Sequence, residues 1–125
     1  MSTNTVATKE HNKKIANMLF AEIYPCYVTK IEKKGRTEKE LKSVIRWLTG
    51  YETKVLNDFI QSNATLKEFF NSAEINPKAK EIKGVICGYR IEEIKSPLTK
   101  KCRYLDKLVD ELAKGKSLEK IFRNS

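Results

Sequence analysis

The sequence predicts an all-α protein, a compact and non-parallel bundle of short helices. Three observations support this class. Start signals for helices recur along the chain, apolar residues follow most of them at the spacing of a helix face, and glycines close several of these runs. The connections between the expected helices are brief, as is usual in helical bundles. A chain of 125 residues suits a single domain with its own core.

The first helix is expected to open near Asn12, because the apolar residues that follow share one helical face. These residues are Ile15, Met18, Leu19 and Ile23. Pro25 should interrupt this helix, since proline lacks the amide donor that a helix interior requires. A second short helix is then expected through Ile31, with Gly35 as its stop.

The middle of the chain carries the clearest start signals. Two capping boxes, each a threonine followed three residues later by a glutamate, are Thr37 with Glu40 and Thr65 with Glu68. Gly50 should end the helix that begins after Thr37, and Thr53 can cap the next one. Pro77 suits the first turn of a further helical element.

Residues 82–94 are ambiguous. Four apolar residues fit one helical face, and they are Ile82, Val85, Ile86 and Tyr89. A short buried strand at residues 85–87, flanked by Gly84 and Gly88, is the alternative. We favour the helix.

The last long helix should open at Ser96 and Pro97, an N-cap followed by proline at the first helical position. Its expected buried face comprises Leu98, Cys102, Leu105, Leu108, Val109 and Leu112. Gly115 should end this helix, and Ser117 can cap a short terminal one.

The net charge of +9 favours acidic partners, nucleic acid above all. Its distribution weakens that interpretation, because the excess is +3 in residues 1–35, +1 in 36–73 and +5 in 74–125, without a long basic block. A solvated basic surface is therefore favoured over a nucleic-acid interface.

Location and domain limits follow from what the chain lacks. No apolar run reaches the length of about 20 residues that a membrane span requires. The odd number of cysteines, three, favours reduced thiols and a cytoplasmic protein. Residues 1–10 lack the apolar core of a signal peptide and are expected to form a flexible extension, with residues 11–125 as the single domain.

Catalytic and metal-binding motifs are weak, and no cofactor, metal or catalytic residue is assigned. His11 is the single histidine and the cysteines are not paired, which disfavours zinc. Cys26, Cys87 and Cys102 are interpreted as small core residues. Gly115-Lys116-Ser117 resembles the end of a phosphate-binding loop, but Asp110 stands where the motif needs its first glycine.

Acidic residues cluster on the last long helix. Asp106 and Asp110 lie one turn apart, with Glu111 beside them, and paired carboxylates can perform acid–base chemistry if they are buried. Charge pairs with basic residues in reach are the simpler account, and these residues are Arg103, Lys107 and Lys114.

Arg46, Trp47 and Tyr51 form the most unusual local cluster and are the predicted interaction surface. Aromatic residues with polar tips are favoured at binding surfaces, although they can equally cover the core at a helix junction. The same region could be a helix-turn-helix with helices at 37–48 and 53–61. One lysine, Lys54, together with Asp58 makes its second helix a poor reader of a DNA groove.

Several segments together resemble a bacterial family catalogued as domain of unknown function 2200. They are Tyr24-Pro25-Cys26-Tyr27-Val28, Lys33-Lys34-Gly35-Arg36-Thr37, Ile45-Arg46-Trp47-Leu48-Thr49-Gly50-Tyr51, Gly84-Val85-Ile86-Cys87-Gly88 and Arg103-Tyr104-Leu105-Asp106-Lys107-Leu108-Val109-Asp110-Glu111-Leu112. The resemblance covers about residues 11–121. It implies an all-helical domain with an orthogonal arrangement, which makes the expected fold a compact orthogonal bundle of about six to seven short helices. It implies no reaction, cofactor or site residue.

Three functions follow as hypotheses. The first is a non-enzymatic domain that binds a protein partner or a second copy of itself. The second is a nucleic-acid-binding protein that uses its positive surface. The third is an enzyme with a carboxylate or a thiol in a cleft, which is the least favoured because no catalytic set assembles from the sequence.

Overall fold

The computed structural model describes residues 2–86 and 88–123, and helices make up most of their regular secondary structure. The α-helices of these residues are α1 (Ser2–Ala16), α2 (Phe20–Glu32), α3 (Glu38–Thr49), α4 (Thr53–Ile60), α5 (Leu66–Asn71), α6 (Pro97–Ala113) and α7 (Leu118–Ile121). Two 3-10 helices, η1 (Pro77–Glu81) and η2 (Ile91–Glu93), flank a small antiparallel hairpin of β1 (Val85–Ile86) and β2 (Tyr89–Arg90). The predicted all-α orthogonal bundle is confirmed.

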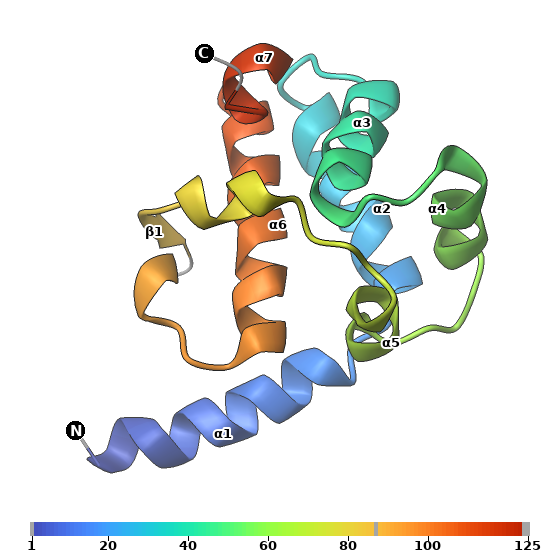
Figure 1. Cartoon of the computed structure of the whole chain (residues 1–125). Helices are drawn as coiled ribbons and strands as arrows, with labels where there is room; N and C mark the ends of the chain where they lie inside the picture. Colours follow the sequence, from blue (N-terminus) through green and yellow to red (C-terminus); the bar gives the residue numbers. More distant parts are fainter. Residues whose placement is uncertain (1, 87, 124–125) are drawn as a thin grey trace.

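The long helix α6 is the axis of the bundle (Figure 1). It contacts α1, α2, α3, α5 and α7, and the hairpin side of the molecule packs on it through β1 and η2. Helix α1 crosses near the start of α6 at a steep angle, while α7 lies at its other end. Ten residues of α6 are buried, which is why one amphipathic helix can organise all the others.

An aromatic cluster fills the core between α2, α4 and α5. The rings of Phe20 and Phe69 stack with centroids 4.0 Å apart, and Phe59 and Phe70 meet Phe69 edge-on. Phe20, Phe69 and Phe70 are all fully buried or nearly so. Burial of such side chains stabilises the fold by about 1.5–3 kcal/mol each.

The helix starts in the middle and at the end of the chain are confirmed. Both capping boxes form, since Thr37 and Thr65 accept from the amides of Glu40 and Glu68, and each glutamate bonds back to its threonine amide. Ser96 and Ser117 cap α6 and α7 as expected, accepting hydrogen bonds from the amides of Thr99 and Lys120. The prediction for Thr53 is wrong by one position, because Glu52 is the N-cap of α4.

The prediction that Pro25 interrupts a helix is wrong. Pro25 lies inside α2, and the chain instead turns at residues 17–19. There the Leu66 amide donates to the Met18 carbonyl, and the Phe20 amide donates to the Ala64 carbonyl. These tertiary backbone bonds separate α1 from α2. Helix α1 already begins at Ser2, so the described part of the expected N-terminal extension is helical.

The helix favoured for residues 82–94 is also wrong. Gly84 and Gly88 have φ values of +106° and +83°, which a right-handed helix cannot contain. The Ile91 amide donates to the Gly84 carbonyl, so the chain folds back on itself as a hairpin. The alternative of a short strand is confirmed for Val85–Ile86, although Val85 is 55% exposed rather than buried. Cys87 lies outside the described residues.

Candidate functional site

Trp47 lies near the end of α3, against the segment that follows α7. Its indole stacks on the ring of Phe122, with centroids 5.6 Å apart and planes 12° from parallel. Asn76 donates a hydrogen bond to the Trp47 carbonyl and so fastens this end of α3 to the segment before η1. Trp47 is half-buried, and none of the described residues accepts a hydrogen bond from its indole N–H. One face of the ring is therefore packed while its polar edge faces solvent.

Arg46 is exposed beside Trp47. Its Nε donates to the backbone carbonyl of Tyr51 at 3.2 Å, which holds the side chain over the turn between α3 and α4. Within the described part of the chain, the two terminal nitrogens of this guanidinium have no protein acceptor. They remain available for a hydrogen-bonding partner, because arginine carries five donors and only one is used here.

Tyr51 is buried under this corner and is 9% exposed. Its hydroxyl donates to the Phe69 carbonyl, and its ring contacts the rings of Phe59 and Phe69 with centroids 5.2 and 5.4 Å away. Burial raises the pKa of the phenol. Of the three residues predicted for the interaction surface, Arg46 and Trp47 reach solvent, whereas Tyr51 takes the core-packing role that the sequence left open.

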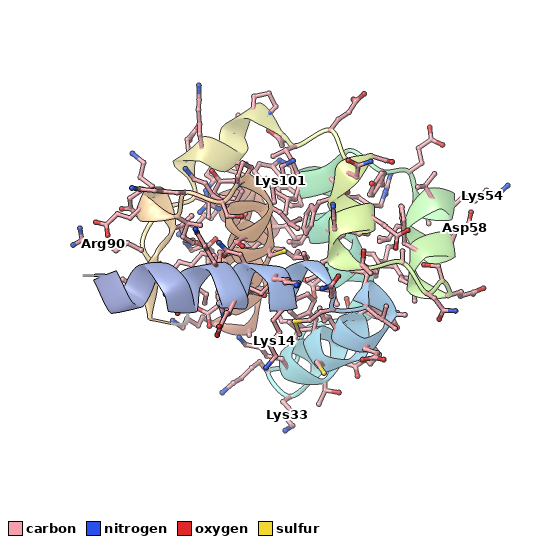
Figure 2. All side chains as sticks on the ribbon, turned by 90° about the horizontal axis from the view of Figure 1, so that it is seen from below. Lys14, Lys33, Lys54, Asp58, Arg90 and Lys101 are labelled. Atoms are coloured by element: carbon pink, nitrogen blue, oxygen red, sulfur yellow. The ribbon has the colours of Figure 1, made fainter. Side chains whose placement is uncertain are left out.

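Basic side chains labelled in Figure 2 point to different sides of the molecule. Arg90 and Lys54 lie at opposite sides of the molecule, and Lys33 projects from a third (Figure 2). Lys54 shares its region of α4 with Asp58, so the second helix of the helix-turn-helix alternative presents charges of both signs. A DNA-binding helix needs cations along the face that meets the phosphates, and α4 does not have that pattern.

A chain of polar side chains links α1, α2 and α6, and the sequence did not predict it. Tyr27 donates to the Asp106 carboxylate at 2.5 Å, and Arg103 donates to the same carboxylate at 2.9 Å. A second terminal nitrogen of Arg103 lies 2.7 Å from the His11 Nε2. Tyr89 covers the end of this chain, with its ring centroid 5.7 Å from both the His11 ring centroid and the Arg103 guanidinium carbon.

The electrostatics of this polar chain do not favour nucleophilic chemistry. Burial and the neighbouring Asp106 carboxylate raise the pKa of the Tyr27 phenol well above its usual value of 10. The same two causes raise the pKa of the Cys102 thiol to about 12. Both groups are therefore protonated near neutral pH, where neither is a good nucleophile. The arrangement joins three helices and leaves the carboxylate between two donors.

The predicted charge network on α6 forms in most of its parts. Asp106 pairs with Arg103 at 2.9 Å and Asp110 with Lys114 at 3.0 Å. Lys107 departs from that expectation, because its ammonium donates to the Val85 carbonyl at 3.2 Å. The two cysteines that the structure describes differ, since Cys102 is buried as expected and Cys26 is exposed, contrary to its interpretation as a core residue.

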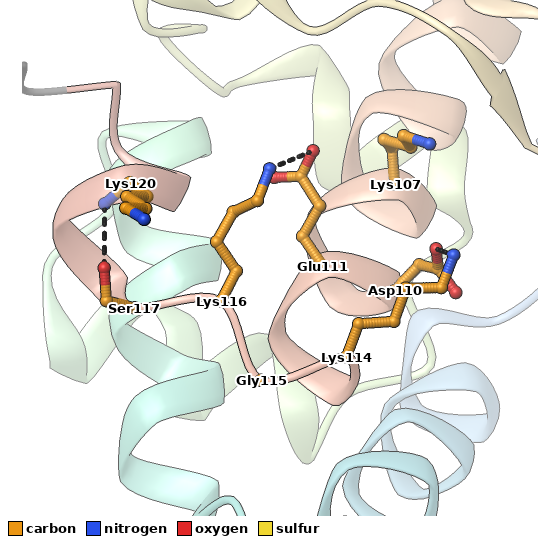
Figure 3. Close-up of a pocket in the computed structure, with 8 residues that line it drawn as sticks. All are labelled: Lys107, Asp110, Glu111, Lys114, Gly115, Lys116, Ser117 and Lys120. Atoms are coloured by element: carbon orange, nitrogen blue, oxygen red, sulfur yellow. Dashed lines mark hydrogen bonds and ion pairs between the residues drawn. The ribbon is translucent and has the colours of Figure 1, made fainter.

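An open hollow of about 640 Å³ lies where α6 ends and α7 begins. Figure 3 shows its lining, which comprises Lys107, Asp110, Glu111, Lys114, Gly115, Lys116, Ser117 and Lys120. Gly115-Lys116-Ser117 therefore lines a concave surface, but the loop follows a helix rather than a strand and Ser117 serves as a helix cap. The geometry is not that of a phosphate-binding loop of the nucleotide-hydrolase type.

Metal ligands do not gather in the described part of the chain: no three His, Cys, Asp or Glu side chains lie close enough together to hold an ion. Among the helices of residues 2–86 and 88–123, none combines the length and apolar character of a membrane span.

The family model for an uncharacterised protein conserved in bacteria, domain of unknown function 2200 (DUF2200), matches residues 14–123. The chain belongs to the DUF2200 family. This DUF2200 protein is also similar to a solved structure titled "Crystal structure of uncharacterized protein SP1917", with 41% identity and a TM-score of 0.84 over 90% of this chain and 93% of that one. None of the curated proteins matches it. The family and the neighbour support the helical fold and carry no assigned activity.

Proposed function

We propose that this DUF2200 protein is a non-enzymatic interaction domain that binds an acidic partner protein through Arg46 and Trp47. The observation that supports it is the state of Trp47, whose ring is held flat on Phe122 while its N–H is left without a protein acceptor. An aromatic side chain that is packed on one face and solvent-exposed at its polar edge loses little conformational entropy on binding. Tryptophan and arginine are also among the residues that contribute most of the binding energy at protein interfaces.

The net charge favours a different partner over a second copy of the chain. The chain carries a net charge of +9, so two copies repel one another unless their contact is large enough to overcome that repulsion. The same charge attracts an acidic protein and speeds its association. The proposal therefore assigns an acidic partner, and self-association is the competing outcome.

A nucleic acid is the second candidate for such a charge. The dispersed cations of Figure 2 do not support it, because nucleic-acid binding draws on several phosphate contacts made by one continuous surface. We place the interaction in the cytoplasm, where free thiols such as those of Cys26 and Cys102 persist in the reduced form.

Site-specific photo-crosslinking in cells tests the proposal. Arg46→p-benzoylphenylalanine places the reactive group beside Trp47, and the same substitution at Lys33, which is exposed at the end of α2, is the matched control. We expect a protein adduct from position 46 that is absent from position 33 and is lost when Trp47→Ala is added. The captured protein should carry an acidic surface or segment.

Three results would overturn the proposal. They are equal adducts at both positions, nucleic acid as the only adduct from position 46, and no adduct at all. An adduct consisting of a second copy of the chain would replace the acidic partner by self-association, which sedimentation across a range of protein concentrations would then confirm.

A further inference from the structure

The hollow at the junction of α6 and α7 is a second feature of the surface with binding chemistry. Its lysines come from three places, the α6 face, the loop after it and α7, so the fold brings them together although they are not a run in the sequence. Lysines near a helix C-terminus are common because they interact favourably with the helix dipole. That explains Lys114, Lys116 and also Lys120, which lies in the last turn of α7, but not Lys107 two turns before the end of α6.

The positive charge of the hollow is not cancelled by the two carboxylates within it. Asp110 pairs with Lys114 and also with Lys30 of α2, at 3.0 and 3.5 Å. Glu111 pairs with Lys116 and also with Arg123, at 3.5 and 3.0 Å. Each carboxylate is thus shared with a cation outside the lining.

Two of the lysines form no ion pair with a carboxylate of the described residues. The Lys107 ammonium meets only a neutral acceptor, the Val85 carbonyl, and none of the described residues offers an acceptor to the Lys120 ammonium. Lys107 is half-buried and Lys120 is exposed, so a carboxylate or phosphate of a ligand can approach either of them. The hollow is therefore suited to an anionic ligand.

The spacing of the lysines favours an extended ligand. Lys107 and Lys114 are two helical turns apart on α6, about 10 Å along its axis, and Lys120 lies beyond the loop. A single small anion cannot reach both ends. Carboxylates on one side of an extended peptide repeat about every 7 Å and can meet cations at either end of the hollow.

An apolar residue that contacts one of the lining lysines, although it does not itself line the hollow, favours a peptide over a nucleic-acid strand. Val85, whose carbonyl receives the Lys107 ammonium, leaves 55% of its surface exposed. An apolar side chain of a peptide can cover it, whereas a sugar–phosphate backbone gains little there. The nearby Arg123 is engaged with Glu111, so no free guanidinium of this region is available for bidentate phosphate contact.

We propose that the hollow binds an acidic segment of the partner protein in extended form, with its carboxylates on Lys107 and Lys120. This rests on the proposed function and adds a second contact to the one at Trp47. The segment lies across the end of α6. The lysines recognise it by the carboxylates that repeat along its length.

Fluorescence anisotropy of a labelled synthetic peptide, in which glutamate alternates with threonine, tests the site. The double variant Lys107→Gln and Lys120→Gln removes two charges from the hollow. The matched control, Lys33→Gln and Lys54→Gln, removes two exposed charges from other faces. We expect the first pair to weaken peptide binding about tenfold and the control pair to have less than a twofold effect. Thermal unfolding followed by circular dichroism checks that both variants fold.

Equal losses in the two double variants would mean that net charge alone attracts the peptide, and would overturn the proposal. So would the absence of peptide binding by the wild-type protein, displacement of the peptide by millimolar inorganic phosphate, or tighter binding of a DNA oligonucleotide of equal charge. Crosslinking from position 46 is independent of these measurements. An adduct there without peptide binding in the hollow rejects the hollow alone, while peptide binding without an adduct rejects the Trp47 surface.

Discussion

The His11 Nε2 lies 2.7 Å from a terminal nitrogen of Arg103, although the two residues are 92 positions apart. A guanidinium has only donors, so this histidine nitrogen accepts and the imidazole is neutral with its proton on Nδ1. The contact fastens α1 to α6. Protonation of His11 would place two donors, and two positive charges, against each other.

This geometry makes the stability depend on pH. Burial, Arg103 and then Lys14 lower the pKa of His11 below its ordinary value of 6.5. Because the folded pKa is depressed, the stabilising contribution is complete above pH 6.5 and is lost as the pH falls through the folded pKa. Asp106 faces the same guanidinium from α6 and pairs with it at 2.9 Å.

Urea unfolding at about pH 7.5 and about pH 5.5 measures this effect. We expect the urea midpoint of the wild-type protein to fall at the lower pH, and His11→Gln to remove most of that decrease. Glutamine keeps an acceptor for Arg103 but does not titrate. An equal decrease in both proteins would show that another group carries the pH dependence.

Asp106→Asn should lower the free energy of unfolding by about 2–3 kcal/mol, because it leaves the buried Arg103 without its carboxylate and weakens the bond from Tyr27. Asp110→Asn removes pairs with two exposed lysines, Lys30 of α2 and Lys114 at the end of α6, and should cost less than about 1 kcal/mol. Chemical denaturation of both variants compares them. Similar losses would contradict the distinct role given to Asp106.

Trp47→Ala and Tyr51→Ala should differ in their cost to stability. Tyr51 is enclosed by Phe59 and Phe69, so its truncation should cost about 3–5 kcal/mol. Trp47 is half-buried and touches Phe122 on one face, and its loss should cost less than about 2 kcal/mol. Thermal unfolding checks the order, and a larger loss for Trp47→Ala would place that residue in the core.

The two described cysteines should react differently with a thiol reagent. Cys26 is exposed, whereas Cys102 is buried with a thiol pKa of about 12. Since the thiolate is the reactive form, we expect modification of Cys26 in the native protein and of Cys102 only in denaturant. Peptide mass mapping in a Cys87→Ser background measures this. Native labelling of Cys102 would show that α6 opens readily.

Local signals predicted much of the fold. The helix starts at Thr37, Thr65 and Ser96 could be predicted because the side chain of an N-cap accepts a hydrogen bond from an amide within the next turn. The signal for such a start is therefore contained in a few neighbouring residues. The turn between α1 and α2 could not be found in this way. It depends on backbone bonds from residues 18–20 to residues 64–66, and the helix around Pro25 is tolerated in that tertiary setting.

The candidate site was predicted less completely, for the same reason. The sequence indicated the aromatic cluster, but only the packing of α5 decides that Tyr51 points into the core. The polar chain through His11 and Arg103 and the lysines of the hollow join residues that are distant in the sequence, and no local spacing signals them. Gly84 and Gly88 were a local signal for the hairpin. The helical spacing of the apolar residues around them was given more weight, and the helix was favoured for that reason.

The affinity of the partner captured at position 46 for the wild-type protein and for Trp47→Ala tests the central claim most directly. Titration calorimetry with the purified partner gives both dissociation constants, and circular dichroism confirms that the variant is folded. An anchoring tryptophan at an interface should weaken binding at least about tenfold when it is truncated. An unchanged dissociation constant in a folded Trp47→Ala protein would contradict the assignment of this corner as the binding surface.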